Sequence, residues 1–193
     1  MAKNATYKVA FRRRLEGKTN YKKRLELVKS GLPRIAVRKS NKFVLVQIIK
    51  FGRAGDNVLA QANSRELEKF GWKASKKNLS AAFLTGLLAG LRAKKAGIEK
   101  AVLDIGFSTP VHGAKCFAAL KGALESGLQI PADASALPPE ERISGKHIEE
   151  FAKKLPEEEF KKRFSKYVKD NVDAKNFVSL FENTRKKILQ EAK

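Results

Sequence analysis

The chain has 193 residues, enough for one domain of ordinary size with an appendage or for two small domains. Hydrophobic residues make up 42% of it, which suffices for a packed core and excludes a wholly disordered basic tail. One cysteine and two histidines exclude a disulfide framework and a Cys/His zinc finger. Because no apolar stretch reaches about 18 residues and the N-terminus leads into charge, we expect neither a membrane-spanning helix nor an export signal.

The net charge of +21 comes from 41 Lys and Arg against 20 Asp and Glu, and it is unevenly spread. Residues 1–53 carry 16 basic and 2 acidic side chains, whereas residues 131–193 carry 14 and 12. Such a gradient predicts a polyanionic partner and says little about the fold. Together with the element pattern, it divides the chain into a basic arm with a first helix (1–30), an α/β core (31–131) and a linker with a helical C-terminal extension (132–193).

The basic arm is expected to be extended up to the arginine run at residues 12–14. Thr19 or Asn20 then caps a helix, and Gly31 ends it before a proline. The first quarter of the chain therefore places many cations outside any predicted core.

Three strand candidates follow in quick succession. Arg34–Ser40 alternates apolar with cationic side chains, and Phe43–Phe51 is nearly continuous and β-branched, as in a buried strand. The sequence Ser40-Asn41-Lys42 is a natural tight turn between them. After the Gly52–Gly55 loop, a third strand is expected at residues 57–63.

Helices and a further strand complete the predicted core. A long helix is expected from about residue 76 to residue 96, in which Gly86 and Gly90 would let another element approach closely. A buried strand at 101–107 and a helix at 114–126 follow. The order strand, helix, strand, helix predicts a right-handed crossover and an α/β fold.

The last third of the chain is predicted to be helical after a linker. Pro131–Pro139, rich in Ala and Pro, has the composition of that linker. Ser144 and Asp173 are candidate helix caps, and Pro156 can begin another helix. Apolar residues at helical spacing predict a small helical extension.

The arm carries the chemistry of nucleic-acid binding. Its aromatic residues Tyr7, Phe11 and Tyr21 are interleaved with Lys and Arg between residues 8 and 24. Cations neutralise phosphates, and aromatic rings offer stacking faces to unpaired bases. A solvated helix face and an anionic membrane surface are the alternatives, but the arm lacks the broad apolar face of an interfacial helix. Composition leaves DNA and RNA open, although a basic sheet face with a flexible arm suits folded RNA.

Enzyme chemistry finds little support in the sequence. His112 and Cys116 stand four residues apart, but a nucleophile and a base also need an orienting group and an oxyanion site. Asp104 is a single carboxylate in an apolar strand, which does not make a two-metal nuclease site. We therefore expect no catalytic residues, no metal site, no cofactor and no small-molecule substrate. The loop at 108–113 could offer N–H groups to a phosphate, or could merely cap its own helix.

Several blocks of the sequence resemble the archaeal and eukaryotic form of the large-subunit ribosomal protein family that binds 5S rRNA, the eighteenth in the universal naming. The resemblance covers about residues 5–131 in order. The blocks are FRRRLEGKTNYKKR (Phe11–Arg24), PRIAVRKSNKFVLVQII (Pro33–Ile49), ELEKFGW (Glu66–Trp72), SAAFLTGLLAGLRA (Ser80–Ala93) and HGAKCFAALKGALESGLQIP (His112–Pro131).

The resemblance implies a three-layer α/β core with a mixed sheet, similar to the ribonuclease-H-like topology but without its catalytic carboxylates. It implies a structural, cytoplasmic constituent of the large ribosomal subunit that binds 5S rRNA and helps attach it to 23S rRNA in the central protuberance. The C-terminal helices would dock against 23S rRNA or neighbouring proteins of the central protuberance. The alternative is an enzyme acting on nucleic acid, such as a degenerate nuclease or an RNA-modifying protein.

The resemblance and the chemistry of the arm together assign RNA-binding positions. The arm would clamp the 5S rRNA backbone, and the hairpin face and its turn would contact an RNA helix and loop. The expected RNA-binding residues are Lys8, Phe11, Arg12, Arg13, Arg14, Lys18, Thr19, Tyr21, Lys22, Lys23, Arg24, Arg38, Ser40, Asn41, Lys42, Gln47, Arg53, Thr109 and His112.

Overall fold

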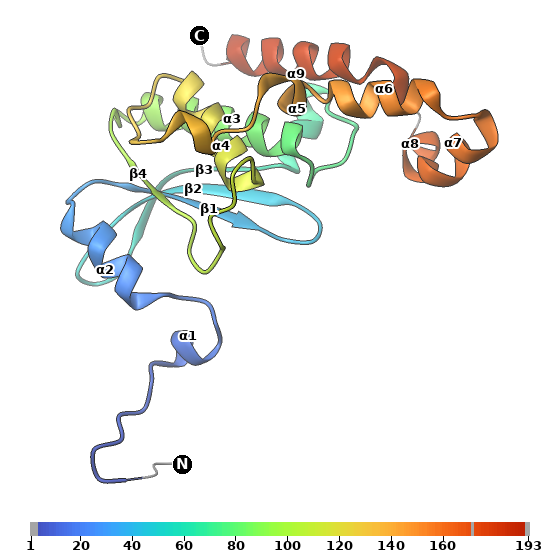
Figure 1. Cartoon of the computed structure of the whole chain (residues 1–193). Coiled ribbons are helices and arrows are strands. Elements are labelled where there is room, and N and C mark those ends of the chain that lie inside the picture. The colour runs from blue at the N-terminus through green and yellow to red at the C-terminus, as the bar shows by residue number, and fades with distance from the viewer. Residues whose placement is uncertain (1–3, 171, 192–193) are drawn as a thin grey trace.

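The computed structural model describes residues 4–170 and 172–191 (Figure 1). Its base is a four-stranded sheet with the order β3-β2-β1-β4, in which β4 runs parallel to β1 and the other neighbours are antiparallel. The expected α/β class with a mixed sheet is therefore confirmed. The strands are β1 (Arg34–Lys39), β2 (Val44–Lys50), β3 (Asn57–Asn63) and β4 (Val102–Asp104).

Side-chain alternation and a serine turn set the register of β1 and β2. Ile35 and Val37 are buried in the core and Arg38 is exposed, as the alternation predicts, but Arg34 of the same cationic face is buried. At the turn, Ser40 Oγ accepts hydrogen bonds from the N–H groups of Lys42 and Phe43 at 3.3 and 3.0 Å. The hairpin expected from the sequence is confirmed, and its tip stands out from the sheet.

Two parallel helices, α3 and α4, cover one face of the sheet. Gly86 lies against Ala119 and Gly90 lies against Ala123. The contact therefore repeats one turn further along each helix in the same chain direction. A Cβ at Gly86 would lie 2.7 Å from the carbonyl carbon of Ala119, so this close approach requires glycine. The sequence prediction of a close neighbour at these glycines is confirmed. The helices are α3 (Leu79–Lys95) and α4 (Lys115–Glu125).

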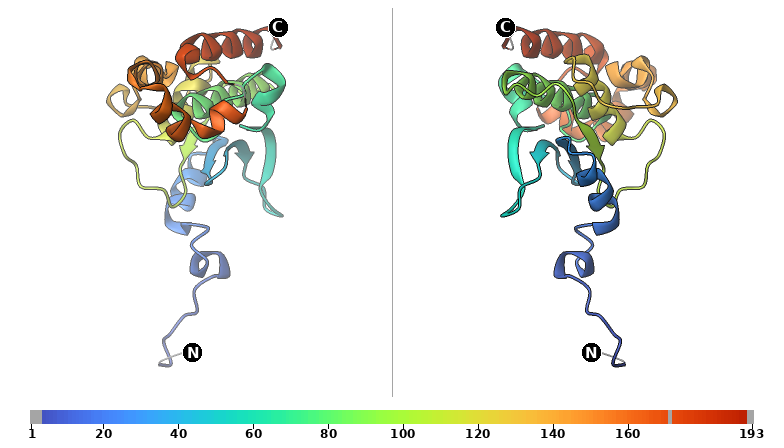
Figure 2. Two further views of the ribbon diagram at one scale, coloured as in Figure 1. Left: turned by 90° about the vertical axis from the view of Figure 1, so that its right-hand side faces the viewer. Right: turned by 90° about the vertical axis from the view of Figure 1, so that its left-hand side faces the viewer.

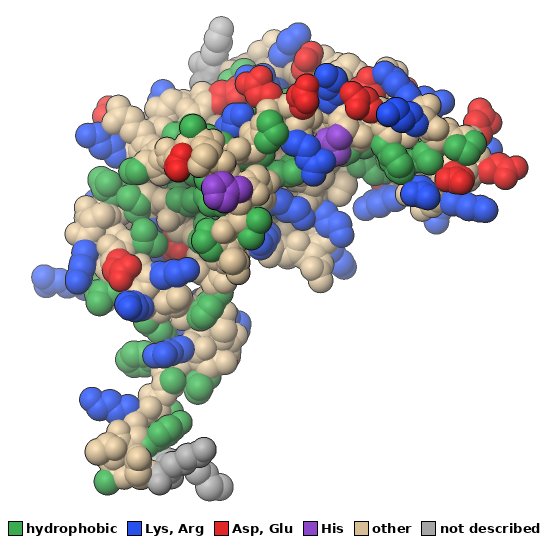
Figure 3. Space-filling model, in the orientation of Figure 1, with side chains coloured by type: hydrophobic (Ala, Val, Ile, Leu, Met, Phe, Trp, Pro, Cys, Tyr) green, Lys and Arg blue, Asp and Glu red, His purple; other side chains and the backbone are tan. Residues whose placement is uncertain are grey.

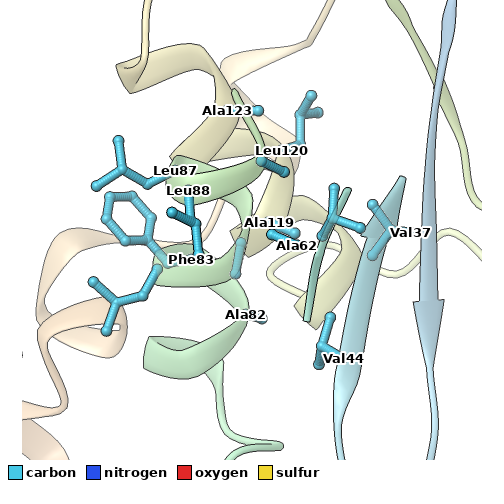
Figure 4. Close-up of a cluster of buried hydrophobic side chains, with 14 of the residues drawn as sticks. Val37, Val44, Ala62, Ala82, Phe83, Leu87, Leu88, Ala119, Leu120 and Ala123 are labelled. Atoms are coloured by element: carbon cyan, nitrogen blue, oxygen red, sulfur yellow. The ribbon is translucent and has the colours of Figure 1, made fainter. Parts of the chain in front are cut away.

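The hydrophobic core lies between the sheet and this helix pair. Figure 4 shows Val37 and Val44 pointing from the sheet toward α3 and α4, with Leu87 and Leu120 among the helix residues of the same cluster. All four side chains are at most 3% exposed. Burial of large aliphatic side chains on both layers holds the two helices over β1, β2 and β3.

The C-terminal helices form a further tier on the outer side of α3 (Figures 1 and 2). Phe177 packs edge-on against Trp72 with ring centroids 5.5 Å apart, and Phe181 lies 5.7 Å from Phe83 of α3. These aromatic contacts fix α9 on the core. The helices of this tier are α5 (Glu140–Ser144), α6 (Lys146–Lys154), α7 (Glu157–Arg163), α8 (Ser165–Lys169) and α9 (Phe177–Glu191).

Short 3-10 turns connect several of these elements. One follows β3, one lies in the Ala- and Pro-rich linker, and one leads into α9. Asp173 caps the last of them by accepting from the N–H of Lys175, as its sequence position indicates. The turns are η1 (Glu66–Phe70), η2 (Ala134–Ala136) and η3 (Ala174–Asn176).

The N-terminal arm leaves the body on the side of the sheet opposite to α3 and α4 (Figures 1 and 2). Asn20 caps α2 (Tyr21–Lys29) by accepting from the N–H of Lys23 at 3.2 Å, which resolves the choice between the two predicted caps. The arginine run forms the single helical turn α1 (Arg12–Leu15) and is not extended, so that expectation is wrong.

Two further boundaries differ from the sequence expectations. β4 spans only three residues, because the chain turns at Gly106 with a φ of 59° and Asp104 Oδ1 accepts from the Gly106 N–H. Ser144 ends α5 and does not cap α6, since Gly145 adopts a left-handed φ of 83° between the two helices. Among the helices of residues 4–170 and 172–191, none is long and apolar enough to cross a membrane.

Candidate nucleic-acid interface

The arm presents its cations to solvent around a pair of aromatic rings. Phe11 and Tyr21 lie with ring centroids 5.0 Å apart, and Phe11 is 70% exposed. Arg13 Nε donates to the hydroxyl of Thr19 at 2.9 Å, which ties α1 to the segment that leads into α2. Lys8, Arg12 and the other predicted arm cations up to Lys23 are likewise exposed, as Figure 3 shows for the arm as a whole.

A groove separates the arm from the uncovered face of the sheet. Its volume is about 750 Å³, and cations from both sides line it, with the carboxylates of Asp56 and Asp104 also in its lining. The sheet contributes Arg38 and Lys39 at the end of β1, and the loop after β4 contributes Ser108. The arm contributes Arg13, Lys18, Thr19, Lys23 and Arg24.

A network of charges under this groove joins the arm to the sheet. Arg34 on β1 donates to Asp56 Oδ2 and to Asp104 Oδ2, each at 2.7 Å, and its side chain is only 5% exposed. Asp56 also accepts from Arg24 of α2 at 2.9 Å. One carboxylate therefore holds an arm residue and a strand residue together.

Asp104 is thus not the isolated carboxylate that the sequence suggests. Its apparent isolation came from reading one strand, whereas Arg34 reaches it from β1 and links it to Asp56 in the loop before β3. Because it neutralises a buried guanidinium, Asp104 acts as a structural counter-ion. Neither Asp56 nor Arg34 was among the expected site residues, and only pairing across the sheet could have revealed them.

The hairpin residues lie further along the same side of the sheet. Ser40, Asn41 and Lys42 are exposed at the tip, and Arg53 is exposed in the loop after β2. Gln47 lies between them on β2, where its amide donates to Gln61 Oε1 at 3.2 Å. The predicted arm and hairpin positions therefore share one side of the molecule.

Thr109 and His112 follow Ser108 in the loop after β4, but unlike Ser108 they do not line the groove. Nδ1 of His112 lies 3.0 Å from the carbonyl oxygen of Ser135, so the ring contacts the linker. In the same loop, the N–H groups of Gly113 and Ala114 donate to Ala136 and Val111. These backbone groups already have partners, which favours the reading of the loop as structural.

The possible nucleophile of the sequence is buried. Cys116 is 3% exposed in the core, and burial raises the pKa of its thiol, whereas His112 is exposed in the loop. Within the part of the chain that the structure describes, no three His, Cys, Asp or Glu side chains are grouped as a metal site would need. What the interface offers is positive charge, hydrogen-bond donors and aromatic faces.

A comparison with protein-family models matches residues 5–98 and 93–133 to the family described as "Ribosomal large subunit proteins 60S L5, and 50S L18". The chain belongs to this family. The matched range contains the arm, the hairpin, the sheet and both core helices.

Three archaeal relatives, each called large ribosomal subunit protein uL18, extend the similarity over nearly the whole length of this chain. The protein of Korarchaeum cryptofilum is 49% identical over 97% of this chain and 97% of its own. That of Methanothermobacter thermautotrophicus is 48% identical over 99% and 100%, and that of Ignicoccus hospitalis 48% over 100% and 96%.

Membership in the L5/L18 family settles the broad function. The chain is a structural constituent of the large ribosomal subunit in the cytoplasm, and ribosomal RNA is among its partners. The alternative of an enzyme acting on nucleic acid is wrong, because this family is structural.

Proposed function

We propose that the protein binds 5S rRNA through the arm and the uncovered sheet face, and that it helps to attach this RNA to 23S rRNA in the central protuberance. The observation that carries the proposal is the groove between the arm and β1, which cations line from both sides. An RNA strand in this groove would meet Arg13 and Lys18 on one wall and Arg38 and Lys39 on the other.

The physical role of these cations is to neutralise phosphates. Each phosphate contact releases a condensed counterion, so the logarithm of the binding constant falls with the logarithm of salt concentration by about 0.7 to 0.9 per contact. The Phe11–Tyr21 pair adds a face on which an unpaired base can stack, which is sequence-tolerant. The arm thus supplies affinity for RNA, while the rigid sheet orients the arm.

Selective retention of 5S rRNA tests the proposal. The purified protein is mixed with separated rRNAs at several salt concentrations, and the change of Arg12, Arg13 and Arg14 together to Ala is compared with the wild type. We expect selective, salt-sensitive binding of 5S rRNA by the wild type and a salt slope lower by about two to three contacts in the variant. Equal binding of all rRNAs would contradict the proposal.

The chain contains a matched control for the arginine run. Lys161, Lys162 and Arg163 are three consecutive exposed cations on α7, far from the groove in sequence. Their joint change to Ala removes the same charge, so a general electrostatic effect would lower 5S affinity equally in both variants. A loss confined to the arm variant supports the specific role of the arm.

We also propose that the helical extension contacts 23S rRNA or neighbouring proteins. Its near balance of 14 basic and 12 acidic residues between positions 131 and 193 suits a mixed contact. Phe151 and Val168, each 43% exposed, offer apolar surface on this extension. Crosslinking from these positions in the assembled subunit would identify what covers them.

The ribonuclease-H-like topology of the core belongs to the same proposal. In its support, three consecutive antiparallel strands are followed by a parallel strand next to β1, reached through a helix. A parallel bridge between Lys100 and Gln129 continues the pattern beyond β4. Superposition on solved ribonuclease-H-like cores would test this assignment.

A further inference from the structure

A second pocket, with polar side chains buried in its wall, lies on the opposite side of the sheet from the arm. It has a volume of about 290 Å³ and is formed where α3 and α4 begin and where α5 meets α6. None of its lining residues also lines the arm groove. The pocket is therefore spatially distinct from the interface described above.

Helix geometry makes this pocket electropositive. α3 and α4 are parallel, so their N-termini lie at the same end of the pair, and Lys115 is the first residue of α4. The first turns of α3 and α4 contain no acidic residue that would neutralise them. Unpaired N–H groups and the positive ends of two helix dipoles therefore point toward one region.

Three buried polar atoms at the pocket lack a partner among the described residues. Ser80 is 1% exposed, and its hydroxyl makes no hydrogen bond. The same holds for Nδ2 of Asn78 and for Nδ1 of His147, which enters from the first turn of α6. Leaving such groups unsatisfied is costly, and a hydroxyl, an amide N–H and an imidazole together suit an oxygen-rich ligand.

The charge around these atoms selects an anion. Lys77, Lys115 and Arg142 line the pocket, and no carboxylate is among its described lining residues. Asn78 itself caps α3 through its oxygen, which accepts from the N–H of Ala81 at 2.8 Å. Since the oxygen is used in this cap, the amide nitrogen is left as a donor without a partner among the described residues.

We propose that this pocket binds a phosphate group of the RNA backbone, held by Ser80, Asn78 and His147 with the charges of Lys115 and Arg142. It would give the protein a second phosphate site on the helical side, away from the arm. Binding here does not depend on the proposed contact between the arm and 5S rRNA. An RNA phosphate and a small phosphate compound share this chemistry, and the test separates them.

Inorganic phosphate is the first probe. The full chain, labelled with ¹⁵N, is titrated with phosphate in place of chloride at constant ionic strength, and the Leu79 and Ser80 amide signals are followed. We expect saturable shifts at millimolar phosphate and about tenfold weaker binding in Ser80→Ala and in Arg142→Gln. Lys69→Gln, which removes an exposed cation on η1 outside the pocket, should leave the titration unchanged.

The second probe is large-subunit rRNA, with Lys115→Gln combined with Arg142→Gln. For this double variant we expect weaker RNA binding and a salt slope lower by about one contact. The variant in which Arg12, Arg13 and Arg14 are changed to Ala should bind inorganic phosphate as the wild type does. Phosphate binding with unchanged RNA affinity would overturn the RNA assignment in favour of a small phosphate compound. If the amides of wild-type α3 fail to shift at about 50 mM phosphate, the phosphate site itself is refuted.

Discussion

Arg34 and Asp104 form a buried ion pair between β1 and β4, with Nη1 and Oδ2 2.7 Å apart. The two strands are parallel neighbours through only three residue pairs, so this side-chain contact adds to a short ladder. The second carboxylate on Arg34, from Asp56, completes its neutralisation. The guanidinium therefore serves the sheet and is not available to RNA.

Removal of one carboxylate from this network should destabilise the fold. In Asp104→Ala, Arg34 stays buried with one partner fewer, and such a loss costs on the order of 3 kcal/mol. Urea unfolding followed by circular dichroism measures it. Glu125→Ala breaks the more exposed pair with Arg185 and should cost at most about 1 kcal/mol, so equal losses would show that burial of the Arg34 pair is unimportant.

Gly86→Ala should be far more costly than an ordinary glycine change. The added Cβ would overlap the backbone at Ala119, which forces α3 and α4 apart, and the gain in helix propensity of about 1 kcal/mol cannot offset this. We expect a loss of about 3 kcal/mol in the free energy of unfolding. Thermal and urea unfolding both report it.

Gly31→Ala is the matched control for Gly86→Ala. Gly31 has a φ of 69° and nothing within 4 Å of an added Cβ, so only backbone strain of about 1 kcal/mol is expected. If both variants lost the same stability, close helix packing would not be the reason for glycine at position 86.

His147 should make the protein less stable in mild acid. Burial, together with the charge of Arg142, lowers its pKa below the ordinary 6.5. The unfolded chain therefore binds more protons than the folded one just below pH 6.5, and stability falls as the pH falls through this window. His147→Gln should flatten the dependence of the urea midpoint on pH between about 7 and 5, measured without phosphate.

Glu149 does not obscure this window. Glu149, whose pKa is lowered by hydrogen bonds from Lys153 and the Val178 N–H, loses its contribution only below its ordinary 4.5. An identical pH profile for wild type and His147→Gln would show that the histidine is not desolvated in the folded protein.

Local patterns predicted the parts of the fold that local chemistry determines. The Ser40 turn, the helix cap at Thr19 or Asn20 and the close approach at the glycines of α3 all follow from short-range sterics and hydrogen bonds. The structure confirms each of them and selects Asn20 as the cap. The failures lie where another segment intervenes. β4 ends early because Asp104 turns to Gly106, and Ser144 does not cap a helix because Gly145 separates α5 from α6.

The same division applies to the interface. Charge density marked the arm as a binding element, since that property belongs to the sequence itself. The groove could not be predicted in this way, because its two walls come from the arm and from the sheet. Lys39 and Asp56 were therefore recognised as neighbours of the arm only in the structure. Individual RNA contacts of the predicted residues stay predictions.

Asp56 has a consequence for how the arm meets its ligand. Arg24 already donates to this carboxylate, so a phosphate that approaches Arg24 competes with an intramolecular anion. A phosphate bound there would exchange one ion pair for another, so the gain in energy would be smaller than at the solvated arginines of α1. Displacement of the carboxylate would also remove one tie between α2 and the sheet, and the direction of the arm could then adjust to the RNA.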